Sequence, residues 1–168
     1  MQKNWYIVCL MHNVILQLDE FPFFVGREAH DGGNSLAMDE SFISRNQFAL
    51  DMRAGRMWYV NQSTTNLALV DGGYPFELEL SPDKVHLVKL GDIFIGIGTD
   101  VEAVYLAVLD VSPDLFKAFV NGNEVGPLLT EHLYEACERG IFDETTTVYN
   151  LRDPDAVYNV VELLEQLR

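Results

Sequence analysis

Short apolar runs follow one another along the first 110 residues, and the turns between them are rich in glycine, asparagine and aspartate. Runs of this length are typical of β-strands, because an amphipathic helix needs a longer stretch with a 3.6-residue period. Many short strands with tight turns indicate a β-sandwich, and the pattern leaves no room for an ordinary helix before residue 110. The expected strands are 5–10, 14–18, 21–25, 48–52, 57–60, 67–70, 76–80, 85–90, 93–97 and 103–108.

Turn signals support this division. His12 and Asn13 separate the first two runs, and Ala54-Gly55 predicts a hairpin between 48–52 and 57–60. Asp31-Gly32-Gly33-Asn34 predicts a further turn, since these residues adopt turn conformations at little cost.

The composition changes after residue 110. Residues 111–115 are expected to form a linker, and 116–120 one more strand followed by a turn at 121–123. The fold class is therefore mainly β, with a β-sandwich over residues 1–110 and a small α+β domain over 116–168.

Two helices are expected in the second domain. Thr130 is predicted to cap a helix that ends at Gly140. Asp153 and Pro154 are predicted to open a last helix as its N-cap and first residue.

Charge and cysteine content limit the classes of function. Acidic residues outnumber basic ones by 26 to 11, which gives a formal net charge of −15. A surface this acidic repels polyanions, so neither nucleic acid nor an anionic membrane is an expected partner. Cys9 and Cys137 fit a reducing compartment, and no signal peptide or membrane span is evident, so we expect a cytoplasmic protein.

Catalytic and metal-binding signatures are not evident. The four histidines are scattered without an i, i+4 pair, and none accompanies a nucleophile motif. We expect no metal, no cofactor and no enzymatic activity.

Arginines and hydroxyl groups recur at the turns of the predicted sandwich. Gly26-Arg27 ends one run, Ser44-Arg45 precedes another, and Ser63-Thr64-Thr65-Asn66 follows a third. Arginine forms bidentate bonds with phosphate, and hydroxyl and amide groups add neutral hydrogen bonds. The set suits recognition of a phosphate without reaction. Taken singly, each motif also has a structural explanation, as a strand end or as a turn that bonds its own backbone. Arg53 and Arg56 are expected to be hairpin charges, and they become candidates only if that hairpin leans towards the site.

These motifs, in this order, resemble those of the forkhead-associated (FHA) domain. The resemblance covers residues 5–108: Phe24-Val25-Gly26-Arg27, then 43–47 (ISRNQ), then 61–72 (NQSTTNLALVDG), then 90–96 (LGDIFIG). It implies a β-sandwich of about 11 strands. It also implies that loops at one end bind phosphothreonine peptides.

The resemblance assigns roles to individual residues. Arg27, Ser44 and Arg45 would hold the phosphate, Thr65 would add a hydroxyl contact, and the Asn66 amide would hold the peptide main chain. The implied partner is a phosphothreonine-containing protein, such as a Ser/Thr kinase or its substrate.

Two positions depart from the family pattern. Gln47 stands where the family has a histidine that braces the loops, so Gly26 and Gln47 are the expected scaffold of the site. Leu67 replaces a glycine and would be strained if its φ were positive. The alternative function is therefore a degenerate FHA scaffold that assembles with a partner or with itself independently of phosphorylation.

The C-terminal segment resembles a bacterial GYF-like domain more faintly. The resemblance rests on residues 121–128 (NGNEVGPL), the helix before Gly140, and residues 147–149 (TVY). It implies a patch of Phe116, Tyr149 and Tyr158 that would bind proline-rich peptides. Packing within the domain is the ordinary alternative role for these aromatic residues.

Overall fold

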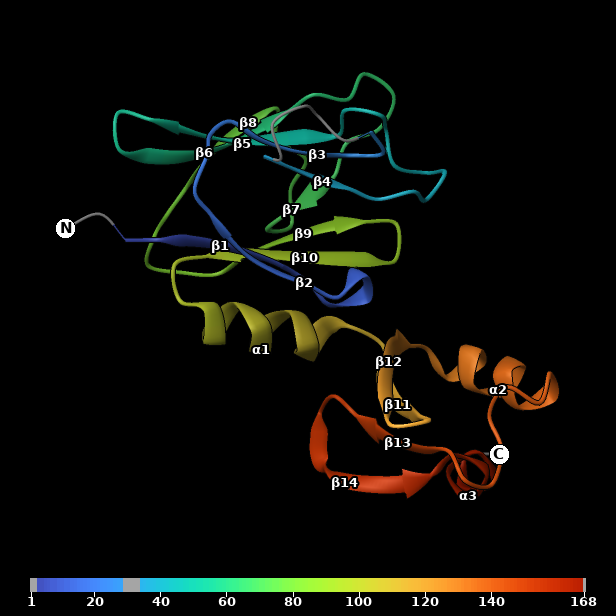
Figure 1. The fold of residues 1–168 in the computed structure, drawn as a ribbon. Helices are drawn as coiled ribbons and strands as arrows, with labels where there is room; N and C mark the ends of the chain where they lie inside the picture. Colours follow the sequence, from blue (N-terminus) through green and yellow to red (C-terminus); the bar gives the residue numbers. More distant parts are fainter. Residues whose placement is uncertain (1–2, 29–33, 168) are drawn as a thin grey trace. The chain divides into compact units, whose positions relative to one another are not determined.

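The computed structural model describes residues 3–28 and 34–167, which form two compact units, Met1–Asp110 and Val111–Arg168 (Figure 1). The first unit contains two five-stranded sheets, and the second contains one four-stranded sheet. Most of the turn predicted at residues 31–34 lies outside the described residues.

The two sheets of the first unit face each other as the layers of a sandwich (Figure 1). One has the order β2-β1-β10-β9-β7 and the other β4-β3-β5-β6-β8. Neighbours pair antiparallel except β3 and β4, which are parallel. The bounds are β1 (Trp5–Cys9), β2 (Val14–Leu18), β3 (Phe23–Gly26), β4 (Ser35–Ala37), β5 (Phe48–Arg53), β6 (Arg56–Asn61), β7 (Leu69–Val70), β8 (Glu77–Leu80), β9 (His86–Leu90) and β10 (Ile93–Gly98).

Alternating side chains of both sheets form the core of this unit. Ile93, Ile95 and Ile97 of β10 are buried together with Phe48 and Leu50 of β5. This period of two is the signature of a strand with one face towards the core. The hairpin predicted at Ala54-Gly55 is confirmed: both residues have positive φ, at 51° and 77°, and they join β5 to β6.

The strand predicted over residues 103–108 is wrong, because this segment belongs to helix α1 (Val101–Val111). The helix begins where Asp100 Oδ1 accepts hydrogen bonds from the backbone N–H groups of Glu102 (3.1 Å) and Ala103 (3.3 Å). A Cβ on Gly96 would lie 2.5 Å from Val108, and one on Gly98 2.7 Å from Val104. The bare backbone of β10 therefore gives α1 room to pack on the outer face of its sheet.

The second unit is a small α+β fold around a core of its own. Its sheet has the order β12-β11-β13-β14, and α2 and α3 contribute Leu133, Val160 and Leu164 to the core. The bounds are β11 (Phe116–Val120), β12 (Asn123–Leu128), α2 (Thr130–Glu138), β13 (Thr147–Asn150), β14 (Asp153–Asn159) and α3 (Val160–Gln166). Because α1 extends to Val111, the predicted linker begins inside a helix.

The predicted caps of the second unit need two corrections. Asp153 and Pro154 open strand β14, where proline is tolerated because β14 is an edge strand. The last helix begins later, with Asn159 as the N-cap that accepts a 3.0 Å bond from the backbone N–H of Val161. Thr130 is the first residue of α2, whose N-cap is Leu129. Gly140 ends this helix as predicted, with φ at 73°.

Candidate functional site

Strand pairing brings three distant motifs to one end of the sandwich. Val25 lies opposite Phe48, and Phe48 lies opposite Asn61. The last residue of β3, the segment before β5 and the loop after β6 therefore meet at the same edge. These are the places that carry Gly26-Arg27, Ser44-Arg45 and residues 63–66.

Gly26 allows the first two segments to approach closely. A Cβ at this position would lie 2.2 Å from the carbonyl oxygen of Arg45 and 3.1 Å from the backbone nitrogen of Gln47. Beside it, the backbone N–H of Arg27 donates to the carbonyl of Ser44 over 2.9 Å. No other residue type fits here without displacing the neighbouring backbone. Gly26 thus fixes the backbone from which Arg27 and Arg45 extend.

Hydroxyl groups gather where the second and third segments meet. Ser44 Oγ lies 2.7 Å from Ser63 Oγ, 3.3 Å from Thr65 Oγ1 and 2.9 Å from Asn66 Oδ1. Ser63 is almost fully buried, whereas Thr65 and Asn66 are exposed. Each hydroxyl is both a donor and an acceptor, so the cluster can redirect its O–H groups towards an incoming acceptor.

The Asn66 side chain ties the loops together. Its Oδ1 accepts hydrogen bonds from Ser44 Oγ and Ser63 Oγ, and its Nδ2 donates to the carbonyl of Phe42 over 2.6 Å. An amide nitrogen has two N–H groups, so one donor remains beyond the bond to Phe42.

Ser63 is the centre of this cluster, and sequence reasoning did not select it as a site residue. Its Oγ accepts bonds from the backbone N–H groups of Thr65 (3.2 Å) and Asn66 (3.1 Å). Asn61 Oδ1 in turn accepts a 3.3 Å bond from the Ser63 N–H. An asparagine at a strand end, followed two residues later by serine, is a signal for such a self-bonded turn.

The side chain of Gln47 connects the segment of Ser44 with the loop of Asn66. It is fully buried, its Oε1 accepts a 2.9 Å bond from the Ser44 N–H, and its Nε2 donates to the carbonyl of Asn66 over 3.3 Å. An amide supplies the one acceptor and one donor that this position needs. Leu67 is not among the described residues with positive φ, so the backbone strain considered for it is absent.

The two arginines of the site are exposed. Arg45 has a single long ion pair in the described structure, with 3.6 Å between its Nε and Oε1 of Glu28. No ion pair of Arg27 is recorded among the residues that the structure describes. Within a chain of net charge −15, Arg45 is therefore only weakly compensated by the carboxylates of the described residues.

Arg53 and Arg56 lie at the opposite ends of β5 and β6 from the site. Arg53 pairs with Asp51 (3.1 Å) and Glu77 (3.4 Å). Arg56 pairs with Glu79 (3.0 Å). Several residues along a strand separate them from Phe48 and Asn61, so the hairpin does not lean towards the site.

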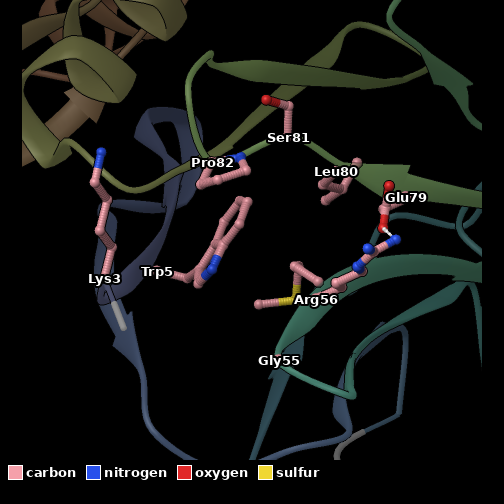
Figure 2. A pocket seen from close by; sticks show the side chains of 9 residues that line it. Lys3, Trp5, Gly55, Arg56, Glu79, Leu80, Ser81 and Pro82 are labelled. Atoms are coloured by element: carbon pink, nitrogen blue, oxygen red, sulfur yellow. Dashed lines mark hydrogen bonds and ion pairs between the residues drawn. The ribbon is translucent and has the colours of Figure 1, made fainter. Parts of the chain in front are cut away.

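A pocket of about 560 Å³ opens at this hairpin end (Figure 2). Its apolar lining includes Trp5 and Leu80, and the Arg56–Glu79 ion pair lies along its side (Figure 2). Because Arg56 begins β6 and the hydroxyl cluster follows its end, this pocket is separate from the candidate site.

Neither cysteine is activated for nucleophilic chemistry. Burial raises the pKa of the Cys9 thiol to about 11, and burial also raises the pKa of Cys137. Reactive cysteines have lowered pKa values, since the thiolate is the nucleophile. No cluster of metal-ligating side chains occurs in residues 3–28 and 34–167. In the same residues, no helix is both long and apolar enough to cross a membrane.

The sheet of the second unit separates Tyr149 from the other two aromatic residues of the predicted peptide patch, Phe116 and Tyr158. Tyr158 lies opposite Val148, which lies opposite Ala118, and Phe116 shares that core-facing side. Tyr149 lies opposite Lys117 on the other side and contacts Phe119, with 5.7 Å between the ring centroids. Phe116 is only 4% exposed. The three residues therefore do not form one surface.

Solved structures resemble this chain over part of its length. No family model matches the chain, and no curated protein matches it. Among solved structures, EmbR of Mycobacterium tuberculosis, in complex with a low-affinity phosphopeptide, is similar over 58% of this chain with 11% identity and a TM-score of 0.49. This match covers 25% of the EmbR chain, so the likeness spans about a quarter of that protein.

Two FHA domains are similar over nearly their whole length. The FHA domain of CT664 from Chlamydia trachomatis shares 17% identity, with 56% of this chain and 96% of that chain covered and a TM-score of 0.47. An FHA domain of Arabidopsis thaliana shares 16% identity, with 58% and 86% covered and a TM-score of 0.48. The predicted fold class is confirmed: the chain is mainly β, a β-sandwich followed by a small α+β unit. Ten strands are described in the sandwich, where about 11 were expected.

Proposed function

We propose that residues 1–110 bind a phosphothreonine-containing segment of a partner protein, and that the chain is a non-enzymatic adaptor in Ser/Thr kinase signalling in the cytoplasm. The observation that carries the proposal is the hydroxyl cluster of Ser44, Ser63 and Thr65, whose oxygens lie 2.7–3.4 Å apart. It lies beside the paired backbone segments of Arg27 and Arg45.

The chemistry of this end suits a phosphate dianion. A phosphothreonine carries about −1.5 to −2 charges at pH 7 and three strong acceptor oxygens. Two arginines supply the charge, and the hydroxyls of Ser44 and Thr65 supply short neutral donors. The second N–H of Asn66 Nδ2, beyond the one that bonds Phe42, is proposed to hold the main chain of the bound segment. None of these groups activates a nucleophile, which supports a binding role without turnover.

The bracing of the loops favours this proposal over a degenerate scaffold. Gln47 connects the Ser44 and Asn66 segments through both ends of its amide. Leu67 has a backbone without strain. Gln47 and Leu67, the two departures from the family pattern, are therefore compatible with well-ordered loops at the site. We do not extend the proposal to proline-rich ligands, because Tyr149 lies on the other side of its sheet from Phe116 and Tyr158.

The experiment is a titration of the protein with a degenerate phosphothreonine peptide library, followed by fluorescence anisotropy. An unphosphorylated library and a phosphoserine library are measured in parallel. We expect affinity that depends on phosphate, and binding about 10- to 100-fold weaker for Arg27→Ala, since a charged hydrogen bond contributes about 1.5–3 kcal/mol.

Arg56→Ala is the matched control. It removes the same side chain and the same charge from the far end of β6, so its affinity should equal that of the wild type. Equal binding by the wild type and Arg27→Ala would refute the site. An absence of phosphate-dependent binding would refute the function and favour the phosphorylation-independent scaffold.

A further inference from the structure

The pocket at the hairpin end lies between the two sheets of the sandwich. Trp5 of β1 lines it from one sheet, and Met57 of β6 and Leu80 of β8 line it from the other. Each of these side chains is at most 5% exposed, so the walls belong to the core and are fixed by its packing. The volume of about 560 Å³ lies within the range of small-molecule sites, about 300–1,000 Å³. The sandwich can therefore accept a small ligand at this end without separating its sheets.

The rim of the pocket is also held in place. Ser81 and Pro82 line it where the chain crosses from β8 to β9. The Pro82 carbonyl accepts a 2.7 Å hydrogen bond from Thr99 Oγ1, and Ser81 Oγ accepts one of 3.2 Å from the backbone N–H of Asp83. Because the rim is formed before a ligand arrives, binding does not have to order it.

The indole N–H of Trp5 has no hydrogen-bond acceptor among the residues that the structure describes, although a buried tryptophan usually finds one. In the same residues, two side-chain polar atoms are fully buried without a partner, Glu40 Oε2 and the Tyr59 hydroxyl, and Trp5 Nε1 is not one of them. Solvent in the pocket that Trp5 lines therefore reaches this nitrogen. Because an indole nitrogen only donates, a ligand at this place must present an acceptor.

The lining of the pocket has an excess of positive charge. Lys3 and Arg56 lie on either side of the Trp5 ring (Figure 2). Arg56 pairs with Glu79 over 3.0 Å, so these two charges cancel. No ion pair or hydrogen bond of Lys3 is recorded within residues 3–28 and 34–167. Salt screens exposed charges beyond a Debye length of about 8 Å, so the lining acts on a bound ligand more strongly than the distant carboxylates of the chain do. The pocket therefore favours an anion.

We propose that this pocket binds a small aliphatic monocarboxylate. The carboxylate accepts hydrogen bonds from the Lys3 ammonium and the Trp5 indole N–H, and the bond from the ammonium is charge-assisted. The aliphatic chain leaves water and packs against Met57, Leu80 and Pro82. A ligand without a charge leaves the ammonium unused, and an anion without a chain leaves the apolar walls unused. The proposal concerns the hairpin end and does not depend on phosphopeptide binding.

The test is isothermal titration calorimetry of the 168-residue chain with sodium octanoate, beside 1-octanol and sodium acetate. We expect one saturable site for octanoate, with a dissociation constant between about 1 µM and about 1 mM. Octanol has the chain without the charge, and acetate has the charge without the chain, so each should bind at least about 10-fold more weakly.

Lys3→Gln removes the charge from the pocket. It should weaken octanoate binding about 10-fold, since a charged hydrogen bond is lost, and should leave octanol binding unchanged. Lys84→Gln is the matched control, because Lys84 is exposed in the turn between β8 and β9 and does not line this pocket. This variant should bind octanoate as the wild type does.

The indole N–H signals report where octanoate binds, because the chain has two tryptophans, Trp5 and Trp58. In a ¹H–¹⁵N correlation spectrum, assigned with Trp58→Phe, octanoate should shift the Trp5 signal more than the Trp58 signal. Circular dichroism should show native folding for every variant. An absence of octanoate binding overturns the proposal, as does equal binding of octanol or acetate. Octanoate binding by Lys3→Gln that equals that of Lys84→Gln, or a Trp5 signal that does not move, also overturns it.

Discussion

The two ends of the first unit each present two arginines, and their surroundings differ. At the hairpin end, Arg53 and Arg56 pair with carboxylates of β5 and β8 at 3.0–3.4 Å. At the other end, Arg45 has one long pair with Glu28, and the neighbouring groups are hydroxyls and amides.

The difference shows that arginine content alone does not indicate an anion site. A guanidinium that already holds a carboxylate must lose that bond before it binds a phosphate. The free energy that an arginine contributes to phosphate binding therefore depends on whether carboxylates already neutralise its charge. The two ends also differ in how they are held: a close backbone approach and a buried amide at one, exposed ion pairs at the other.

The largest expected effect is that of Gly26→Ala. This variant should disrupt the end of the sandwich that carries the candidate site and leave the hairpin end intact. The added Cβ would lie 2.2 Å from the Arg45 carbonyl oxygen, so the two backbone segments must separate. We expect the free energy of unfolding to fall by about 3 kcal/mol or more, at the upper end for overpacked cores, because the clash is with backbone atoms. Urea unfolding measures this change, and phosphopeptide binding should be lost with it.

Gly73→Ala is the control for that variant, because the nearest atom to an added Cβ there is 3.8 Å away. Its free energy of unfolding should stay within about 0.5 kcal/mol of the wild type. If Gly26→Ala were equally mild, the close approach would not be what shapes the site.

The next effect is that of Gln47→Ala, which leaves the Ser44 N–H and the Asn66 carbonyl without their side-chain partners. Removing a buried partner costs about 1–3 kcal/mol. Gln47→Glu is a second variant: as a carboxylate it keeps an acceptor for Ser44, loses the donor to Asn66 and adds the cost of a buried charge. The free energy of unfolding measured in urea should be higher for the wild type than for either variant. Stability of Gln47→Ala equal to wild type would show that the loops hold without this brace.

Sequence reasoning was most accurate where the determinants are local. The Ala54-Gly55 hairpin follows from residues that accept positive φ, and the period-two runs identify strands with one buried face. It failed at residues 103–108 because a short apolar run does not distinguish a strand from a buried helix segment. The deciding information, the room above Gly96 and Gly98, lies on another element.

The same limit applies to the candidate site. Arg27, Ser44 and Thr65 could be selected from the order of their motifs. The central role of Ser63 depends on contacts with residues 19 positions away, such as the 2.7 Å approach of Ser44 Oγ. The separation of Phe116 from Tyr149 depends on strand register, which the aromatic spacing does not specify.

The smallest expected effect is that of Arg56→Ala at the hairpin end. Its side chain is 71% exposed, and that of its partner Glu79 is 42% exposed. Solvent and salt screen such a pair, so exposed ion pairs contribute about 0.2–1 kcal/mol. Urea unfolding should therefore place this variant near the wild type and above Gly26→Ala and Gln47→Ala, and added sodium chloride should reduce the small difference further. A loss comparable to that of Gln47→Ala would mean that the ion pairs hold the hairpin end as firmly as the buried amide holds the site. The contrast between the two ends would then lie in their charges alone and not in how their backbones are fixed.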